Sequence, residues 1–164
     1  MSRLLSQPES PIDPIVEIMG FRLSTATVLF HAAIADRLGV GVTDLKCYSV
    51  LRQTGAITAG ELSERVGLTT GAITGVIDRL ERAGLVQRVR DAQDRRRVVL
   101  ELLTNPEHEQ LLNQLYGPLG RAISELTAQY SEAERAIILD FITRATATVE
   151  SETTALRRAA GGAS

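Results

Sequence analysis

Arg88-Val-Arg-Asp-Ala-Gln-Asp-Arg-Arg-Arg-Val-Val-Leu-Glu-Leu-Leu-Thr104 is the stretch of this chain that decides its fold. Two segments with alternating apolar residues lie on either side of a polar tip that ends in Arg95, Arg96 and Arg97. The pattern predicts a β-hairpin with guanidinium groups at its tip. Residues 87–97 hold five Arg and two Asp, a local net charge of +3 (5 − 2). Taken alone, such a tip is equally consistent with a phosphate-facing surface and with a solvated turn.

The segment before the hairpin predicts a helix over 71–83, because Ile73, Val76, Ile77 and Leu80 recur at helical spacing and define a buried face. The exposed side of this helix is expected to carry Thr70, Thr74, Gly75, Asp78 and Arg79.

A short helix over 59–66 is predicted just upstream, since Thr58 and Glu61 form a capping box and Gly67 ends the apolar pattern. Two short helices joined by so tight a turn are typical of a helix-turn-helix.

Four further helices account for most of the remaining chain. Apolar residues at helical spacing predict helices over 12–38 and 43–54. Capping boxes at Thr104–Glu107 and Ser131–Glu134 open two long helices, the first with a kink near Tyr116 where Gly117-Pro118 interrupts it. The second is expected to end near Leu156. The fold class is therefore mainly α with a small two-stranded β-wing, a winged helix-turn-helix plus a helical dimerisation layer.

The domain organisation follows from this order. Residues 43–104 suffice for a winged helix-turn-helix, while 1–11 are expected to form a flexible arm and 157–164 a frayed tail. The helices in 12–39 and 105–156 carry apolar stripes wider than a monomer needs, so they are expected to form a dimerisation region.

Composition excludes several classes of protein. The chain has 164 residues and a formal net charge of −2, so it is not a globally basic nucleic-acid binder. A single cysteine, Cys47, excludes an internal disulfide. No signal peptide and no apolar run of membrane-spanning length are expected, which predicts a soluble cytoplasmic protein. No zinc spacing, nucleophile–base pair or phosphate loop is recognisable, so neither an enzyme nor a metal or cofactor site is expected.

Residues 68–86, followed by Asp94-Arg95-Arg96 and the run to Leu103-Thr104, resemble the recognition helix and wing motif of the MarR family of bacterial transcriptional regulators. The resemblance covers roughly residues 15–149. It implies a homodimer on a pseudo-palindromic operator in double-stranded DNA, with recognition helices in successive major grooves and wings in the flanking minor grooves. It further implies a repressor that small phenolic or anionic ligands release from DNA.

Within that resemblance, each expected DNA contact has a physical role. Thr69 and Thr70 lie at a helix N-terminus that favours phosphate, and Thr74 suits a base edge. Arg96 suits a narrow A·T minor groove, with Asp94 as its orienting partner. For the threonines, capping and solvation are the alternative. The full set of expected contacts is Thr58, Thr69, Thr70, Gly71, Thr74, Gly75, Arg79, Arg88, Arg90, Asp94, Arg95, Arg96 and Arg97, of which Arg88, Arg90 and Arg97 are assigned to phosphates.

The sequence departs from the family at Gly75, where members commonly carry a longer, often basic side chain. Direct base readout by the recognition helix is therefore expected to be thinner, and the wing to carry more of the binding.

Three other groups of residues could carry chemistry. His31, Tyr48, Arg52 and Tyr116 are candidate ligand contacts, and ordinary interior or surface positions explain each of them equally well. His108, between acidic neighbours, is expected to be solvated. Cys47 is expected to be a buried bystander, with a redox-sensing regulator as the alternative. A further alternative function is a winged-helix protein-interaction module whose arginine tip meets an acidic partner.

Overall fold

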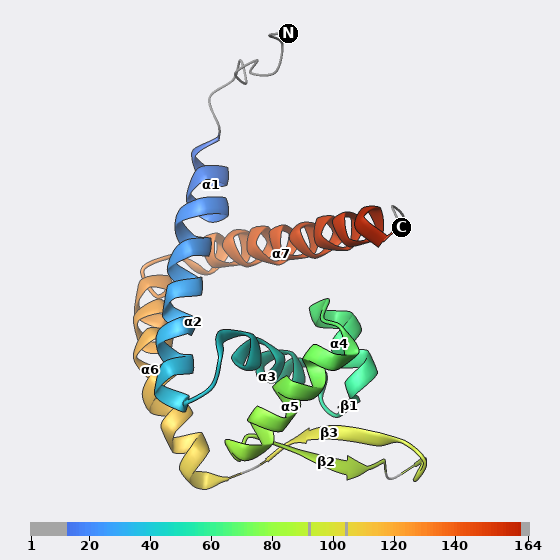
Figure 1. The fold of residues 1–164 in the computed structure, drawn as a ribbon. Coiled ribbons are helices and arrows are strands. Elements are labelled where there is room, and N and C mark those ends of the chain that lie inside the picture. Colours follow the sequence, from blue (N-terminus) through green and yellow to red (C-terminus); the bar gives the residue numbers. More distant parts are fainter. Residues whose placement is uncertain (1–12, 92, 104, 162–164) are drawn as a thin grey trace, which may run out of the picture. The chain divides into compact units, whose positions relative to one another are not determined.

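The computed structural model describes residues 13–91, 93–103 and 105–161, and of residues 160 and 161 only the backbone (Figure 1). The chain forms two compact units, Met1–Leu103 and Thr104–Ser164. The expected arm over 1–11 and the expected cap residue Thr104 lie outside the described residues.

The first unit begins with one long helical stretch. Asp13 caps it by accepting a hydrogen bond from the Ile15 N–H, and Gly39, at φ 67°, ends it in the left-handed conformation. Its parts are α1 (Pro14–Glu17), a π-helical segment η1 (Ile18–Leu23) and α2 (Ser24–Leu38). The predicted helix over 12–38 is thus confirmed apart from its first residues, and the π-helical segment is a feature that apolar spacing does not report.

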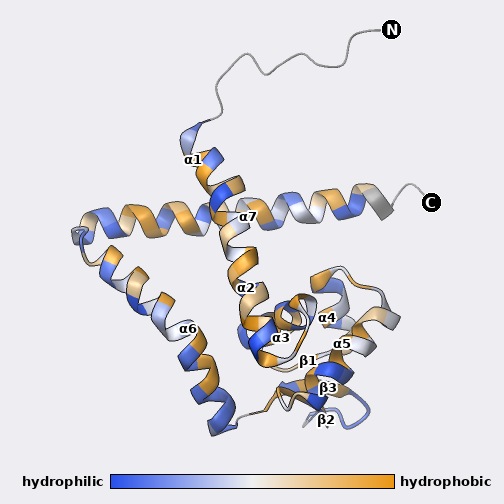
Figure 2. Ribbon diagram, turned by 60° about the vertical axis from the view of Figure 1, so that its left-hand side comes forward, coloured by the Kyte–Doolittle hydropathy of each residue, from blue (hydrophilic) through white to orange (hydrophobic). Residues whose placement is uncertain are grey.

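Figure 2 shows the apolar character of this stretch, and most of its large apolar residues are exposed. Only Ile34 and Ala35 are buried. The expectation that no segment reaches membrane-spanning length is wrong, since Pro14–Leu38 has 25 residues and enough apolar character to cross a membrane by length and composition. A helix of a soluble protein also meets this criterion of length and apolar character when a partner subunit covers its apolar face.

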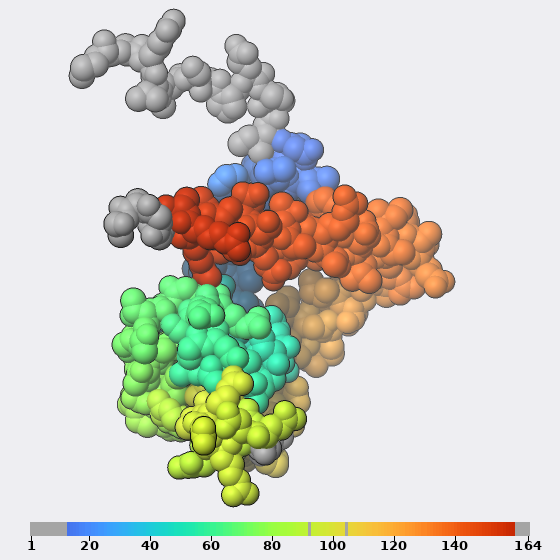
Figure 3. Space-filling view, turned by 90° about the vertical axis from the view of Figure 1, so that its right-hand side faces the viewer, coloured from blue at the N-terminus to red at the C-terminus, as the bar shows by residue number. Residues whose placement is uncertain are grey.

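The rest of the first unit is a winged helix-turn-helix. Its elements are α3 (Val42–Thr54), β1 (Ile57–Thr58), α4 (Ala59–Val66), α5 (Thr70–Arg82), β2 (Val86–Arg90) and β3 (Val98–Leu102). The strands form an antiparallel sheet in the order β1-β3-β2, with Arg88 opposite Leu100 and Ile57 opposite Leu100 on its other side. The predicted hairpin is confirmed, and β1 adds a third strand too short to show alternation in the sequence. Figure 3 shows the hairpin standing out from the body formed by α3, α4 and α5.

A single apolar core holds these elements together. It contains the whole predicted buried face of α5, and every one of those side chains is at most 2% exposed. At about 1.5–3 kcal/mol for each fully buried aliphatic side chain, these contacts fix the orientation of α5. Further fully buried members come from α3, α4, the turn before β2 and the sheet: Leu45, Leu51, Leu62, Leu85, Val86 and Leu100.

One charged residue, Asp44 of α3, is completely buried beside this core. Its Oδ2 accepts hydrogen bonds from the Gly41 N–H at 2.9 Å and from Arg79 Nε at 2.8 Å, and its Oδ1 accepts one from Arg79 Nη2 at 2.7 Å. Burial acts to raise the pKa of the carboxyl, but the hydrogen bonds from Arg79 and Gly41 and the positive charge of Arg79 outweigh it and lower the pKa. The ion pair therefore ties α3 to α5.

The second unit consists of α6 (Pro106–Thr127) and α7 (Glu132–Gly161). The cap of α6 is Asn105, whose Oδ1 accepts a hydrogen bond from the Glu107 N–H at 2.9 Å. The cap lies one residue after the predicted cap residue Thr104, whose own contacts lie outside the described residues. At α7 the predicted box is confirmed, because Ser131 and Glu134 exchange backbone and side-chain hydrogen bonds.

Pro118 lies inside α6, which is one helix across Gly117. The kink predicted near Tyr116 stays a prediction, whereas the predicted end of α7 is wrong. The last helix runs past the predicted end at Leu156 to Gly161, because residues 157–160 are Arg and Ala, which are strong helix formers. Large apolar side chains are exposed along both helices: Leu119, Ile123, Leu126, Ile137, Leu139, Phe141, Ile142, Val149 and Leu156.

The free energy of unfolding is expected to depend on pH through Asp44. The pKa of this carboxyl is lowered from 3.8 in the folded state, so its stabilisation is complete above that value and is lost as the pH falls through the lower folded-state pKa. Asp44→Asn is expected to reduce the free energy of unfolding at pH 7 by about 1–3 kcal/mol and to reduce the loss between pH 7 and pH 3. Urea denaturation at both pH values measures this, with Glu64→Gln on the exposed face of α4 as control. An unchanged pH dependence in Asp44→Asn would contradict the assignment.

Candidate nucleic-acid interface

Threonines cap α5 and occupy its first turns. Thr69 caps the helix, its Oγ1 accepting a hydrogen bond from the Ala72 N–H at 3.3 Å. The Thr74 hydroxyl donates to the Thr70 carbonyl at 2.9 Å, so its methyl group and oxygen lone pairs remain for an outside partner. Both Thr70 and Thr74 are exposed. Thr58, in contrast, is engaged in the capping box of α4, where the Glu61 N–H donates to its Oγ1 at 3.2 Å.

Two positions on the outer side of α5 are glycines and carry no side chain. A Cβ added at Gly71 would meet nothing within 4 Å, whereas one added at Gly75 would lie 3.4 Å from Arg79 Nη1. The helix backbone is therefore open to close approach at Gly71, and the guanidinium of Arg79 lies beside Gly75.

The tip that joins β2 to β3, residues 91–97, is held by backbone hydrogen bonds to two aspartates. Asp91 Oδ1 accepts from the Gln93 N–H at 2.7 Å and the Asp94 N–H at 3.2 Å. These bonds lower the pKa of Asp91. The backbone closes the turn where the Asp91 N–H donates to the Arg97 carbonyl at 3.0 Å. Asp91 was not among the predicted site residues, although an Asp opening a turn is a recognisable signal.

Asp94, the predicted orienting partner of Arg96, contacts the backbone of that residue. Its Oδ1 accepts a hydrogen bond from the Arg96 backbone N–H at 3.0 Å, and the described tip contains no ion pair between the two side chains. A carboxylate held in an Asx turn fixes the course of the chain, so Asp94 aims Arg96 through its backbone.

The wing arginines fall into two groups. Arg88 bridges Glu81 and, at 2.7 Å, Asp78 of α5, and Arg97 pairs with Glu61 of α4 at 3.1 Å. These pairs brace the wing against both helices of the helix-turn-helix and compete with the predicted phosphate contacts of Arg88 and Arg97. Glu61 is held as a carboxylate, since hydrogen bonds from Thr58 and then the charge of Arg97 lower its pKa.

The second group lies at the tip. Arg90 Nη1 donates to the Arg95 carbonyl at 3.1 Å. The side chains of Arg95 and Arg96 are exposed and make no hydrogen bond or ion pair within the described part of the chain. The arginines available to an outside anion are therefore concentrated at the tip.

The candidate ligand residues are distributed over both units. In the first, His31 of α2 is half-buried with its ring 6.0 Å from Phe30, Tyr48 is buried in α3, and Arg52 is exposed in the last turn of α3. Tyr116 belongs to α6 in the second unit.

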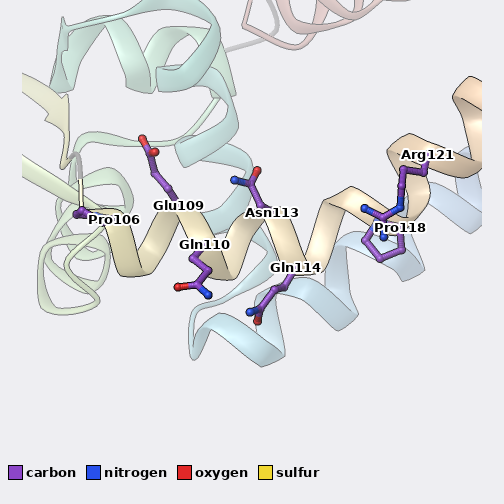
Figure 4. Close-up of a pocket in the computed structure, with 7 residues that line it drawn as sticks. All are labelled: Pro106, Glu109, Gln110, Asn113, Gln114, Pro118 and Arg121. Carbon is purple, nitrogen blue, oxygen red and sulfur yellow. The ribbon is translucent and has the colours of Figure 1, made fainter.

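A pocket of about 630 Å³ lies along one side of α6 (Figure 4), and none of the four candidate ligand residues lines it. Its lining residues, five polar residues and two prolines, all come from this single helix: Pro106, Glu109, Gln110, Asn113, Gln114, Pro118 and Arg121. The expectation of a solvated His108 on the same helix is wrong, because its Nδ1 is buried without a hydrogen-bond partner among the described residues.

Cys47 is completely buried in α3. Burial, followed by the negative charge of Asp44, raises the pKa of its thiol to about 11. A thiol with that pKa is ionised in about one molecule in 10⁴ at pH 7, and the thiolate is the reactive form. The described residues also contain no cluster of His, Cys, Asp or Glu that could hold a metal ion.

Comparisons with known proteins place the chain. A model described as the MarR family matches residues 42–98, which span α3 to the start of β3. The Bacillus subtilis protein named "Uncharacterized HTH-type transcriptional regulator YcgE" is 42% identical over 137 residues, 84% of this chain and 88% of the relative. The regulator FarR of Neisseria gonorrhoeae is 32% identical over 76 residues, 46% and 48% of the two chains.

Solved structures share the fold. The apo form of MarR from E. coli superposes with a TM-score of 0.56 at 24% identity, covering 83% of this chain and 98% of that one. A MarR protein from Peptoclostridium difficile gives a TM-score of 0.62 at 18% identity, with coverage of 95% and 99%. The long, high-identity match to the Bacillus relative and the family match over the winged helix agree with this fold. The chain therefore belongs to the MarR family of winged helix-turn-helix transcriptional regulators.

Proposed function

We propose that this regulator is a homodimer that binds a pseudo-palindromic operator in double-stranded DNA of the bacterial cytoplasm and represses transcription until a small ligand releases it. The observation that carries the DNA-binding part is the pair of exposed arginines, Arg95 and Arg96, on a tip whose backbone is fixed by Asp91 and Asp94. A fixed tip loses less conformational entropy on binding than a mobile one.

The two DNA-facing elements suit different grooves. The exposed face of α5, with Thr70, Gly71 and Thr74, is narrow and carries small side chains, so the helix can lie deep in the major groove. Arg95 and Arg96 extend from the hairpin toward the flanking minor groove, where A·T-rich DNA has its strongest negative potential. The ion pairs of Arg88 and Arg97 set the angle between these two elements.

The dimer is supported by the apolar side chains that each unit leaves exposed. Leu29 of α2 is 65% exposed, and Ile137 of α7 is 70% exposed. Monomeric proteins rarely expose apolar patches of such extent, and a second copy is the commonest way to cover them. A two-fold symmetric protein then reads a two-fold symmetric site.

The ligand part of the proposal rests on Tyr48 and Arg52, which are four residues apart and so share a face of α3. An arginine beside an aromatic ring suits an aromatic carboxylate. His31 of α2 is the third candidate in this unit, and Tyr116 of α6 is a separate candidate in the second unit. A panel of aromatic acids tests this part, because a true effector lowers DNA affinity and raises the thermal unfolding temperature of the free protein.

DNA binding is tested by fluorescence anisotropy with duplexes selected from genomic fragments, over a series of salt concentrations. Affinity is expected to fall steeply with salt and to exceed that for random DNA, because phosphate contacts release counterions and base contacts add specificity. Arg96→Ala is expected to weaken binding by about 1–3 kcal/mol, most for A·T-rich flanks.

Arg37→Ala, an exposed position at the end of α2, is the matched control and is expected to bind as the wild type does. Equal affinity for random DNA, or full binding by Arg96→Ala, would contradict the role of the tip. A co-purifying acidic protein bound without DNA, together with failure to select any duplex, would instead support a protein-interaction module.

One chain has a mass of 17.8 kDa. Sedimentation equilibrium is expected to give twice that mass. Leu29→Lys places a charge on the exposed apolar face of α2 and is expected to shift the protein toward the monomer. A wild-type monomer that binds phospholipid vesicles through Pro14–Leu38 would contradict the dimer and indicate a membrane role for this helix.

Cys47 is expected to react with a thiol reagent only when the protein unfolds, because the thiol is buried and its pKa is about 11. Labelling in buffer and in urea measures the difference. Rapid labelling of the native protein, coupled with DNA release by peroxide that Cys47→Ser abolishes, would establish a redox-sensing regulator instead.

A further inference from the structure

Arg79 of α5 is held by a residue from another helix. Its Nε and Nη2 form two parallel hydrogen bonds to the Asp44 carboxylate at 2.8 and 2.7 Å. Asp44 is itself fixed, since it is completely buried and also accepts the Gly41 N–H. A fork-to-carboxylate pair of this kind determines the orientation of the guanidinium plane as well as its position. Arg79 is thus pre-oriented before any partner arrives.

The third nitrogen of this guanidinium lies over Gly75. Side chains on a helix lean toward its N-terminus, so Arg79 covers the position one turn earlier. A Cβ at Gly75 would sit 3.4 Å from Arg79 Nη1, and a longer side chain there would occupy the space that the guanidinium takes. No hydrogen bond of Nη1 occurs within the described residues, and 47% of the Arg79 side chain is exposed.

We propose that Arg79, positioned by Asp44 across Gly75, is a specificity-determining residue that donates from Nη1 to an acceptor on a base edge in the major groove. Guanine O6 and N7 are the acceptors that arginine most often contacts there. Asp44 is a positioning residue, since it is buried and acts only through Arg79. The base contact that Gly75 itself cannot make is supplied by a side chain four residues later. This inference rests on the proposed DNA-binding function.

A purely structural role for the ion pair makes a different prediction. If the pair only ties α3 to α5, then weakening it lowers the thermal stability and leaves the order of preferred bases unchanged. If it also aims Nη1, weakening it removes discrimination at one base position in each half-site. The readout is therefore the profile of relative affinities over all single-base variants of the selected operator, measured well below the unfolding temperature.

Two variants make the test. Arg79→Lys keeps the charge but lacks the fork, and it is expected to reduce discrimination at one position of each half-site by about tenfold. Asp44→Asn is expected to give the same loss at the same position, although residue 44 is buried. Arg82→Lys is the matched control, because Arg82 is exposed on the same helix and its Nε donates to the Asp78 carbonyl at 3.2 Å. It is expected to leave that position unchanged.

The outcomes separate this inference from the proposed function. A wild-type protein that selects no duplex overturns the proposed function and this inference with it. A wild-type protein that selects an operator, with folded Arg79→Lys and Asp44→Asn variants that keep the wild-type base profile, overturns this inference alone. A uniform loss of affinity at every sequence also overturns it, because that result indicates a phosphate contact. Should Asp44→Asn fail to fold, Arg79→Lys against Arg82→Lys decides the question.

Discussion

Burial of one face of α5 is the constraint on which the rest of the winged helix depends. Ile73, Val76, Ile77 and Leu80 are removed from water together, against α3, α4 and the sheet. Once this face is buried, the rotation of the helix about its axis is determined. Gly71, Thr74 and Gly75 are then presented to the outside without a further interaction being needed to orient them.

Charged residues determine the shape and the charge of the wing, which packing alone does not. The chain is slightly acidic overall, yet the tip of the wing is basic. The carboxylates near the proposed DNA surface have structural roles. Asp91 and Asp94 accept backbone hydrogen bonds and shape the tip, while Asp78, Glu81 and Glu61 hold Arg88 and Arg97. Within the wing, the arginines without a carboxylate partner are Arg90, Arg95 and Arg96, so the positive charge is concentrated toward the tip.

The helices outside the winged helix follow another principle. In both units, aliphatic and aromatic side chains such as Phe21 and Phe141 lie open to solvent in the single chain. Figure 2 shows this apolar character along α2 and along α7. Exposed apolar surface is costly in water, and the proposed homodimer would lower that cost by covering it. The apolar character of Pro14–Leu38 fits the same proposal.

The sequence by itself determined the features whose causes lie within a few residues. Apolar spacing located the buried face of α5, capping boxes located the starts of α4 and α7, and alternation around a charged tip located the hairpin. Asp94 was also predicted to orient Arg96, and its carboxylate accepts a hydrogen bond from the Arg96 backbone N–H. Local patterns also missed β1, which has only two residues, and the π-helical segment η1.

Only the tertiary structure decided which charges meet. Asp44 and Arg79 are 35 residues apart, and Glu61 and Arg97 are 36 apart, so no helical or strand periodicity relates them. The sequence placed Arg79 on an exposed face and Gly75 as a gap in base readout. The fold shows that the first lies over the second because α3 brings a buried carboxylate within reach of α5. Local sequence fixes which residues a helix exposes, whereas the packing of helices fixes the direction in which they point.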